Sequence, residues 1–351
     1  MFVNPAEWHE ICTKMFTTVG VPEEDAGLVA DTALTADIRG VASHGSVRLP
    51  VYRERIQRGL INPTPSIRIV NDCPTLVHLD GDNGLAQVVD NKAAQIAAER
   101  ANKYGVCCVA TYNTNHMALL SHYGLKIAEQ GLIAYIMCNT PPFVATMGAA
   151  EPVIGTNPIC WCIPGKEFPI VLDMAISPAR GKIKNAAAAG KPIPEGWALD
   201  KNGRPTTDAA AALEGMLLPI AGHKGYGIGV VVEVFSALLT GGKYGKNVTH
   251  PLDDYDHKPN CGNFIMALDP SKIMAEEDFV RRVDDYVQMV KSSKKSSPDA
   301  DILFPGELEH RNELLVAERG LEIASFSGGA APGQAEVRER EAAAAEPPTE
   351  A

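Results

Sequence analysis

The sequence predicts a mixed α/β protein, and three observations lead to this fold class. The first sixty residues carry three helical patterns. Short β-rich runs then alternate with helical patterns, which is typical of a mixed sheet covered by helices. No GxGxxG motif occurs anywhere in the 351 residues, so the dinucleotide fingerprint of a Rossmann fold is missing.

Composition and charge argue against several classes of protein. Hydrophobic residues make up 45% and charged residues 21% of the chain, as in a globular enzyme. The formal net charge of -11 would repel a phosphate backbone, so nucleic acid is not an expected partner. The longest apolar stretch, 228–239, is too short to span a bilayer, and no signal-peptide pattern opens the chain. We therefore expect a cytoplasmic protein without membrane contact.

The cysteines agree with that compartment. Eight are present, mostly inside apolar runs such as 106–109 and 159–163, and neither run has CxxC spacing. We expect all eight to be reduced and most of them to be buried.

The first sixty residues are expected to form three helices. Asn4 has the residue type of an N-cap, Pro5 suits the first helical position, and Gly20 follows the end of the first helix. Pro22 and three acidic residues open the second helix. The third is expected over 43–60.

The middle of the chain alternates between strand and helix patterns. Strands are expected at 66–70 and 75–79, followed by a Gly-Asp-Asn-Gly turn and an Ala-rich helix over 86–104. The pattern continues with a strand at 106–112, a helix at 117–130 and a strand at 132–138.

The remaining elements are shorter until residue 220. Several short strands are expected between 151 and 176, then a helix over 179–189 and a polar hairpin at 192–207 with an Asn-Gly turn. Later elements are helices at 224–239 and 276–291, a strand at 262–268, and a helix that begins at 305–307. Residues 326–351 are rich in Gly, Ala, Glu and Pro, which predicts a disordered tail.

Three side chains on the third predicted helix could carry chemistry. His44, Arg48 and Tyr52 are four residues apart, so on a regular helix they would form one stripe. A guanidinium can hold a carboxylate, and a nearby imidazole can move a proton. Spacing alone leaves open the alternative of a solvated helix face with a coincidental histidine.

Two further clusters could bind anions. Residues 113–116 join an apolar strand to a helix, where free backbone N–H groups often meet ligands. Residues 222–227 open an apolar helix with glycines and Lys224, although glycines there could also serve close helix packing. His116 and His122 would point about 120° apart on a helix, and HExxH is absent, so no metal site is expected.

Taken together, these clusters resemble the malate/L-lactate dehydrogenase family. The motifs that carry the resemblance appear in family order: DIRGVASHG at 37–45 followed by Arg48, NH at 115–116, EPVIGTNP at 151–158, VLDMA at 171–175, ARGK at 179–182, IPEGWA at 193–198, KGYG at 224–227 and PGE at 305–307. The resemblance implies a fold distinct from the Rossmann enzymes, with a largely antiparallel cofactor-binding sheet and helical terminal regions.

The resemblance also implies an activity and a set of site residues. The chain is expected to interconvert a 2-hydroxy acid, such as malate or lactate, and its 2-oxo acid with NAD or NADP, NAD being slightly favoured, as a homodimer with a shared active site. His44, beside Ser43, matches the proton donor, and Arg48 matches the residue that binds the carboxylate. The other expected substrate-binding residues are Tyr52, His116, Thr156, Arg180 and Lys224. The expected cofactor-binding residues are His116, Met117, Ala118, Leu119, Leu120, Asp173, Met174, Ala175, Lys224, Gly225, Pro305, Gly306 and Glu307.

A domain division follows from the same resemblance. We expect a helical terminal domain from 1–65 and 300–325, a mixed region from 66–125 and 210–270, and a cofactor-binding sheet region at 126–210. The end of the chain departs from relatives, which close with a short helix where 320–324 here runs into the tail.

Two departures bear on specificity. Imine-reducing members carry a Ser–His–Asp relay, and Lys182 occupies the position where the aspartate is expected, so we hypothesise that His44 has a lowered pKa suited to alcohol oxidation. Ureidoglycolate-oxidising relatives carry a lysine near Thr140, which disfavours that substrate here.

Two alternatives remain open. One is a reductase of a diketo sugar acid or a cyclic imino acid with the same fold. The other is a nucleotide-binding regulatory protein without activity, which the joint presence of His44, Arg48, His116 and Lys224 disfavours.

Overall fold

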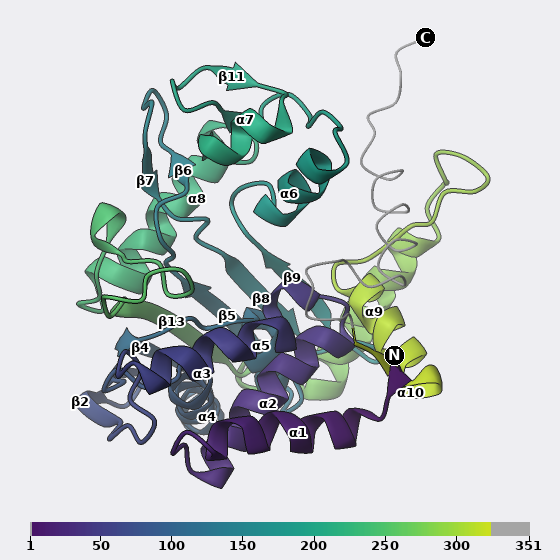
Figure 1. Ribbon diagram of the computed structural model, residues 1–351. Helices are drawn as coiled ribbons and strands as arrows, with labels where there is room; N and C mark the ends of the chain where they lie inside the picture. The colour runs from purple at the N-terminus through teal and green to yellow at the C-terminus, as the bar shows by residue number, and fades with distance from the viewer. Residues whose placement is uncertain (1, 324–351) are drawn as a thin grey trace.

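The computed structural model describes residues 2–323, and its main feature is a seven-stranded sheet (Figure 1). The strands lie in the order β2-β3-β4-β13-β5-β8-β9. Their bounds are Arg68–Cys73 (β2), Leu76–Asp80 (β3), Val106–Thr114 (β4), Ile133–Cys138 (β5), Ile159–Ile163 (β8), Ile170–Met174 (β9) and Cys261–Leu268 (β13). Only β3 and β4 pair in parallel, so the sheet is largely antiparallel, as predicted.

Two helices cover one face of this sheet. Helix α4 (Ala86–Tyr104) contributes a row of alanines to the main core, and α5 (Leu120–Ala128) adds Tyr123 and Ile127, all of them buried. Small side chains on α4 let that helix lie close to the strands. Helix α8 (His223–Glu233), continued by a π-helix (η3, Val234–Leu238), packs on the opposite face against Ala110, Met137 and Phe264.

A second body is built around a sheet of short strands in the order β11-β10-β12-β6-β7, which Figure 1 shows above the main sheet. Helices α6 (Arg180–Ala188) and α7 (Ala209–Glu214) pack with it around the buried residues Ile183, Ile193 and Leu217. The strands are Val144–Ala145 (β6), Pro152–Ile154 (β7), Ala198–Leu199 (β10), Pro205–Thr206 (β11) and Met216–Leu217 (β12). The predicted Asn-Gly hairpin corresponds to β10 and β11.

The N-terminal helices form a third core. Helix α1 (Pro5–Thr17) begins as predicted, since the Asn4 side chain accepts a hydrogen bond from the Ala6 N–H at 2.8 Å. Helix α2 (Glu23–Ile38) packs between α1 and α4. Phe16, Val29 and Leu49 are among the side chains buried here.

The third predicted helix is wrong over its first half. Residues 42–44 and 46–48 form two separate 3-10 turns (η1 and η2), and α3 covers only Leu49–Gln57. The chain is extended at Gly45, with φ -86° and ψ -150°, and Pro50 lies at the start of α3. Proline fits the first turn of a helix and breaks its interior, so Pro50 was the sequence signal for this boundary.

The helix predicted over 117–130 also begins late, at Leu120, because residues 115–119 form an irregular loop with Ala118 at φ 65°. A non-glycine residue in this conformation interrupts a right-handed helix. By contrast, the helices predicted over 86–104 and 276–291 have the same bounds in the structure, as α4 and α9 (Glu276–Lys291).

The first and last described segments, residues 2–3 and 321–322, pair with each other. Strand β1 (Phe2–Val3) is antiparallel to β14 (Leu321–Glu322), which follows α10 (Glu307–Arg319). Helix α10 docks on α2, where Asn312 donates to the Ile38 carbonyl at 2.6 Å and Arg39 pairs with Glu313. The tail predicted at 326–351 lies outside the described residues.

The domain division stays a prediction. Strands from the predicted regions 66–125, 126–210 and 210–270 all belong to the seven-stranded sheet. None of the helices within residues 2–323 is both long and apolar enough to cross a membrane. All eight cysteines are free thiols, and six of them are buried.

Candidate active site

The loop that carries Ser43, His44 and Arg48 is anchored from α2. The Asp37 carboxylate accepts a hydrogen bond from the Ser46 N–H at 3.0 Å. A Cβ on Gly45 would lie 1.8 Å from Asp37 Oδ1, so this close approach needs glycine. Burial raises the pKa of Asp37 to about 6, against the hydrogen bonds from Ser46, which lower it. The DIRGVASHG motif thus fixes the geometry of the turn that presents His44.

The His44 imidazole has one hydrogen-bond partner among residues 2–323. Its Nδ1 lies 2.9 Å from the Ser43 hydroxyl oxygen. Burial, together with the positive charge of Arg48, lowers the pKa of His44 to about 4. His44 is therefore neutral at pH 7 and can accept a proton. The causes are burial and Arg48, and the effect assigned to Lys182 from the sequence stays a hypothesis.

Tyr52, on α3, meets His116 at the end of β4. The Tyr52 hydroxyl lies 2.6 Å from His116 Nδ1. Burial raises the pKa of Tyr52, whose oxygen also accepts a hydrogen bond from Gln87, and burial lowers the pKa of His116. Both groups are neutral, and a neutral phenol can donate to Nδ1, in which case His116 carries its own proton on Nε2. In that tautomer the Nε2–H of His116 is a donor.

The two imidazoles lie side by side, with ring centroids 5.9 Å apart and ring planes only 20° from parallel. Arg48 completes this group, which we call the histidine cluster (Ser43, His44, Arg48, Tyr52 and His116). The Arg48 Nε donates to the Ser43 carbonyl at 2.7 Å, while its two terminal nitrogens have no partner within residues 2–323. The fork of a guanidinium is thus left available for an anion.

The loop 115–119 has the properties of a ligand-binding segment. Its residues 117–119 are buried, the His116 carbonyl accepts from Gln87, and the Met117 carbonyl accepts from the Tyr123 hydroxyl. The backbone N–H groups of residues 116–120 have no partner among the described residues. Because buried N–H groups are nearly always paired, donors left over in a buried loop indicate a missing acceptor.

A second predicted cofactor segment lies next to this loop. The Asp173 carboxylate, at the end of β9, accepts a hydrogen bond from the Ser121 N–H at 2.8 Å and so caps the start of α5. Met174 and Ala175 follow it, and the Ile176 N–H donates to the Thr156 carbonyl. Thr156 in turn contacts Thr140, with 3.2 Å between the two hydroxyl oxygens. The predicted segments 116–120 and 173–175 are therefore neighbours.

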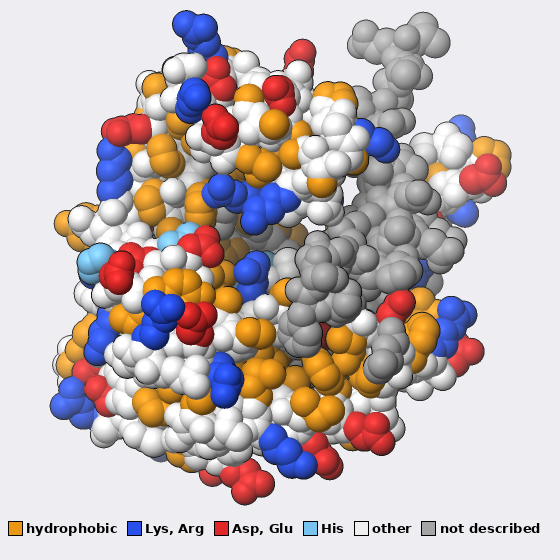
Figure 2. Space-filling view, viewed as in Figure 1, with side chains coloured by type: hydrophobic (Ala, Val, Ile, Leu, Met, Phe, Trp, Pro, Cys, Tyr) orange, Lys and Arg blue, Asp and Glu red, His pale blue; other side chains and the backbone are white. Residues whose placement is uncertain are grey.

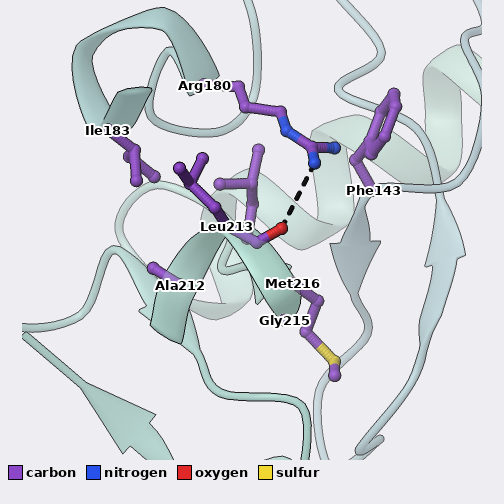
Figure 3. Close-up of a pocket in the computed structure, with 8 residues that line it drawn as sticks. Phe143, Arg180, Ile183, Ala212, Leu213, Gly215 and Met216 are labelled. Atoms are coloured by element: carbon purple, nitrogen blue, oxygen red, sulfur yellow. Dashed lines mark hydrogen bonds between the residues drawn. The ribbon is translucent and has the colours of Figure 1, made fainter. Parts of the chain in front are cut away.

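Arg180 faces the site region from α6. Its guanidinium lies 4.7 Å from the centre of the Phe143 ring and donates to the Leu213 carbonyl at 3.3 Å (Figure 3). The small cavity behind it, lined also by Ile183 and Met216, has a volume of about 10 Å³, enough for a water molecule at most. Figure 2 shows a hollow between the upper and lower bodies, with Lys and Arg side chains on its upper edge and a histidine beside it.

Other predicted site residues lie outside the histidine cluster. Lys224 is exposed at the start of α8, and its side chain makes no hydrogen bond or ion pair within residues 2–323. Gly225 is buried, and a Cβ there would lie 2.2 Å from the Ile220 carbonyl oxygen, which supports the packing interpretation of this glycine.

The PGE turn packs against the edge of the main sheet. The Pro305 carbonyl accepts from the Val171 N–H at 3.0 Å, and a Cβ on Gly306 would lie 2.7 Å from Val171. The Glu307 carboxylate is paired with Lys291 and Arg311, each at 2.6 Å. This carboxylate is fully occupied by the protein, so any contact of this turn with a cofactor would fall to its backbone.

Several site residues have no signal in the sequence. Gln87 lies inside an Ala-rich helix, and Phe143 and His250 lie in loops without a motif. His122, by contrast, has a structural role: it is buried, with Nδ1 2.9 Å from the Thr35 hydroxyl. The described part of the chain contains no group of three His, Cys, Asp or Glu side chains arranged to hold a metal ion.

Comparison with known proteins gives a consistent result. A family model described as malate/L-lactate dehydrogenase matches residues 3–326. The L-sulfolactate dehydrogenase of Methanocaldococcus jannaschii is 39% identical over 324 residues, which are 92% of this chain and 93% of the relative. The solved structure of a sulfolactate dehydrogenase from that organism superimposes with a TM-score of 0.88, covering 93% of this chain and 94% of the other.

Two relatives are named with their cofactors. An Escherichia coli (strain K12) protein named ureidoglycolate dehydrogenase (NAD(+)) is 32% identical over 325 residues, 92% of this chain and 93% of the relative. A Chromohalobacter salexigens protein named (2R)-3-sulfolactate dehydrogenase (NADP(+)) is 34% identical over 321 residues, 91% of this chain and 92% of the relative.

Proposed function

Since the chain belongs to the malate/L-lactate dehydrogenase family, we propose that it interconverts a malate-like or lactate-like 2-hydroxy acid and its 2-oxo acid. Its relatives are named dehydrogenases, and it is an enzyme of the 2-hydroxyacid dehydrogenase class with a nicotinamide cofactor. The observation that carries the proposal is the histidine cluster, in which two imidazoles of different hydrogen-bonding character lie beside an arginine with free terminal nitrogens.

His44 is proposed to move the proton. When its Nδ1–H donates to the Ser43 hydroxyl, its Nε2 is left as a base that takes the proton of the substrate hydroxyl. In the reverse direction the protonated ring returns that proton to the oxygen of the 2-oxo acid. The lowered pKa of His44 favours the direction in which it begins as a base.

His116 and Arg48 are proposed to orient the substrate. The Nε2–H of His116 can donate to the substrate oxygen, and the Tyr52 hydroxyl keeps the ring in that tautomer. The terminal nitrogens of Arg48 can bind the carboxylate bidentately, while its Nε bond to the Ser43 carbonyl fixes the side chain. Together they hold the reacting C–O group beside His44.

The chain fits a nicotinamide cofactor at its irregular loops. The unpaired N–H groups of 116–120 and the neighbouring segment 173–175 are the residues proposed to hold it, and the bound cofactor supplies the hydride acceptor or donor. NAD is proposed ahead of NADP, as in the name of the ureidoglycolate relative. The reduced state of all eight cysteines supports the proposal of a cytoplasmic location.

A homodimer is proposed as the working form. Helix α8 and η3 are apolar on both sides, and only one side is buried. The outward side chains are 37–57% exposed: Ile228, Val230, Val231, Val234, Phe235, Leu238 and Leu239. An apolar surface of this kind usually marks an interface. Light scattering should show two copies for the natural protein and one for the Val231→Glu, Leu238→Glu double variant.

The proposed activity is tested with a panel of substrates. Purified protein is mixed with NADH or NADPH and pyruvate, oxaloacetate, a diketo sugar acid or a cyclic imino acid, and nicotinamide absorbance is followed. We expect turnover of 2-oxo acids, and a loss of at least about 10²-fold in His44→Ala with a modest loss of cofactor affinity. Unchanged turnover in that variant would remove His44 from the mechanism, and binding of cofactor without turnover of any compound would contradict the proposed activity.

A further inference from the structure

We propose that the site selects acids with a second anionic group, a carboxylate or sulfonate beyond the reacting carbon, and that Arg180 and His250 bind this group. The inference rests on the proposed function and deepens it, because it names the substrate class and adds His250 as a residue that determines specificity.

Phe143 brings the two side chains together. The Arg180 guanidinium lies over its ring at 4.7 Å, and the His250 ring meets it edge-on with 5.3 Å between ring centres. We call these three residues the Phe143 cluster. They come from α6, the loop after β5 and the loop 248–257, so three separate segments converge on one aromatic ring.

The hydrogen bonds of His250 fix its tautomer. Its Nδ1 accepts from the backbone N–H groups of Leu252 at 3.2 Å and Asp253 at 3.0 Å. A neutral imidazole whose Nδ1 accepts must carry its proton on Nε2. This Nε2–H lies 3.5 Å from the Asp253 carboxylate, which is 82% exposed and solvated, so it remains available to a better acceptor.

The loop that presents His250 is clamped to α3. Arg55 is fully buried and donates to the carbonyls of Asp254 and, at 3.1 Å, His257. Arg55 lies less than one turn beyond Tyr52 on the same helix. The element that holds the histidine cluster therefore also holds His250, and such preorganisation lowers the cost of ordering a binding site.

Charge links the two clusters. The positive charge of Arg48 lowers the pKa of four side chains, in each case less strongly than burial changes it: His44, Tyr52, His116 and His250. The positive charge of Arg180 also lowers the pKa of His250. Arg180 has no carboxylate partner within the described ranges, and its only hydrogen bond goes to a carbonyl. Arg48 alone can bind the single carboxylate of a monoanionic substrate. Arg180 and the Nε2–H of His250 are additional donors, which a second anionic group can use.

The test compares substrates with one and two negative charges. For the natural protein, kcat/KM for oxaloacetate and 3-sulfopyruvate should exceed that for pyruvate by at least about 10²-fold, as expected for charge-assisted hydrogen bonds. Arg180→Gln should lower the ratio of kcat/KM for the dianions to that for pyruvate about 10²-fold, and His250→Leu should lower this ratio about 10-fold.

His257→Leu is the matched control, because it removes an exposed histidine from the same loop. This variant should leave kcat/KM for oxaloacetate and for 3-sulfopyruvate unchanged relative to that for pyruvate. His250→Gln keeps an N–H donor and should retain most of the preference. Equal kcat/KM for pyruvate and oxaloacetate in the natural protein would overturn the inference while leaving the proposed function intact. A parallel loss on both substrates in His250→Leu would overturn the role of His250.

A further measurement needs no variant. Inhibition by succinate and by butyrate, each measured against pyruvate, should differ by at least about 10-fold in favour of succinate, and equal inhibition would also overturn the inference. If the natural protein turns over no 2-oxo acid at all, the proposed function itself fails, which is a different outcome.

Discussion

The histidine cluster and the Phe143 cluster are built in different ways. In the first, hydrogen bonds from neighbouring side chains hold each partner: Asp37 holds the loop of His44, Tyr52 bonds to His116, and Gln87 supports both Tyr52 and His116. In the second, Arg180 and His250 meet through contacts with a ring, and both side chains remain partly accessible. The chemical step is thus placed on rigid hydrogen bonds, whereas the contacts proposed for selectivity lie on loops and one short helix.

This difference predicts that changes in the histidine cluster affect every substrate and that changes in the Phe143 cluster affect only some. The following predictions test that separation, from the largest expected effect to the smallest.

Arg48→Gln should lower kcat/KM about 10²–10³-fold for monoanionic and dianionic substrates alike. The substitution removes charge-assisted hydrogen bonds to the carboxylate that all these acids share. Steady-state kinetics with pyruvate and oxaloacetate measure the effect, and Arg53→Gln on the same stretch of chain serves as the control. A loss confined to oxaloacetate would place Arg48 among the contacts for selectivity and contradict the proposed separation of the two clusters.

Arg55→Met should affect both clusters through stability. The part-buried carbonyls of Asp254 and His257 would lose their donor, and the buried guanidinium would be lost from the loop contact, at a cost of about 2–5 kcal/mol in the free energy of unfolding. Chemical denaturation measures this cost. Arg58→Met removes an exposed pair with Glu54 and a contact with the Tyr255 ring at 4.5 Å, and should cost only about 1 kcal/mol. Equal stability of the two variants would show that Arg55 does not clamp the loop of His250.

Tyr52→Phe should lower kcat about 10-fold for all substrates, because His116 loses the donor that fixes its tautomer. The ratio of kcat/KM between oxaloacetate and pyruvate should stay constant. Tyr104→Phe, at an exposed position, is the control. A change in that ratio would mean that Tyr52 also shapes selectivity.

The smallest effect is expected from pH on the oxidation reaction. Because the pKa of His44 is lowered to about 4, its imidazole is already neutral near pH 7. The kcat/KM for oxidation should change less than about twofold between pH 6 and 8, and should fall only in more acidic buffer as the ring becomes protonated. Reduction needs the protonated ring, so its kcat/KM should fall as pH rises. An essential base with an apparent pKa well above 7 would contradict the assignment of His44.

Much of the fold could be predicted from local patterns. The helix 86–104 was predictable to the residue, because its alanine row and the glycine after it are local signals. The error at 43–60 had a local cause too, since Pro50 and Gly45 both argue against a continuous helix. The pairing of β1 with β14 had no such signal, because strands of two residues carry no periodicity.

The site was predictable only in part. The resemblance singled out His44, Arg48 and His116, yet the stripe expected on one helix does not exist, because His44 and Arg48 lie in separate turns. Gln87 and His250 could not be found in this way, since a lone polar residue in a helix or loop has no distinguishing spacing.

By itself the sequence determined the fold class, the residue types needed for proton transfer and anion binding, and most long helices, because these depend on neighbours within one or two turns. The tertiary structure decided that His116 meets Tyr52 and His44, that Arg55 holds the loop of His250, and that residues 2–3 pair with residues 321–322. These contacts join segments far apart in the chain, and their geometry follows from how the sheet and its helices pack, which local patterns do not encode.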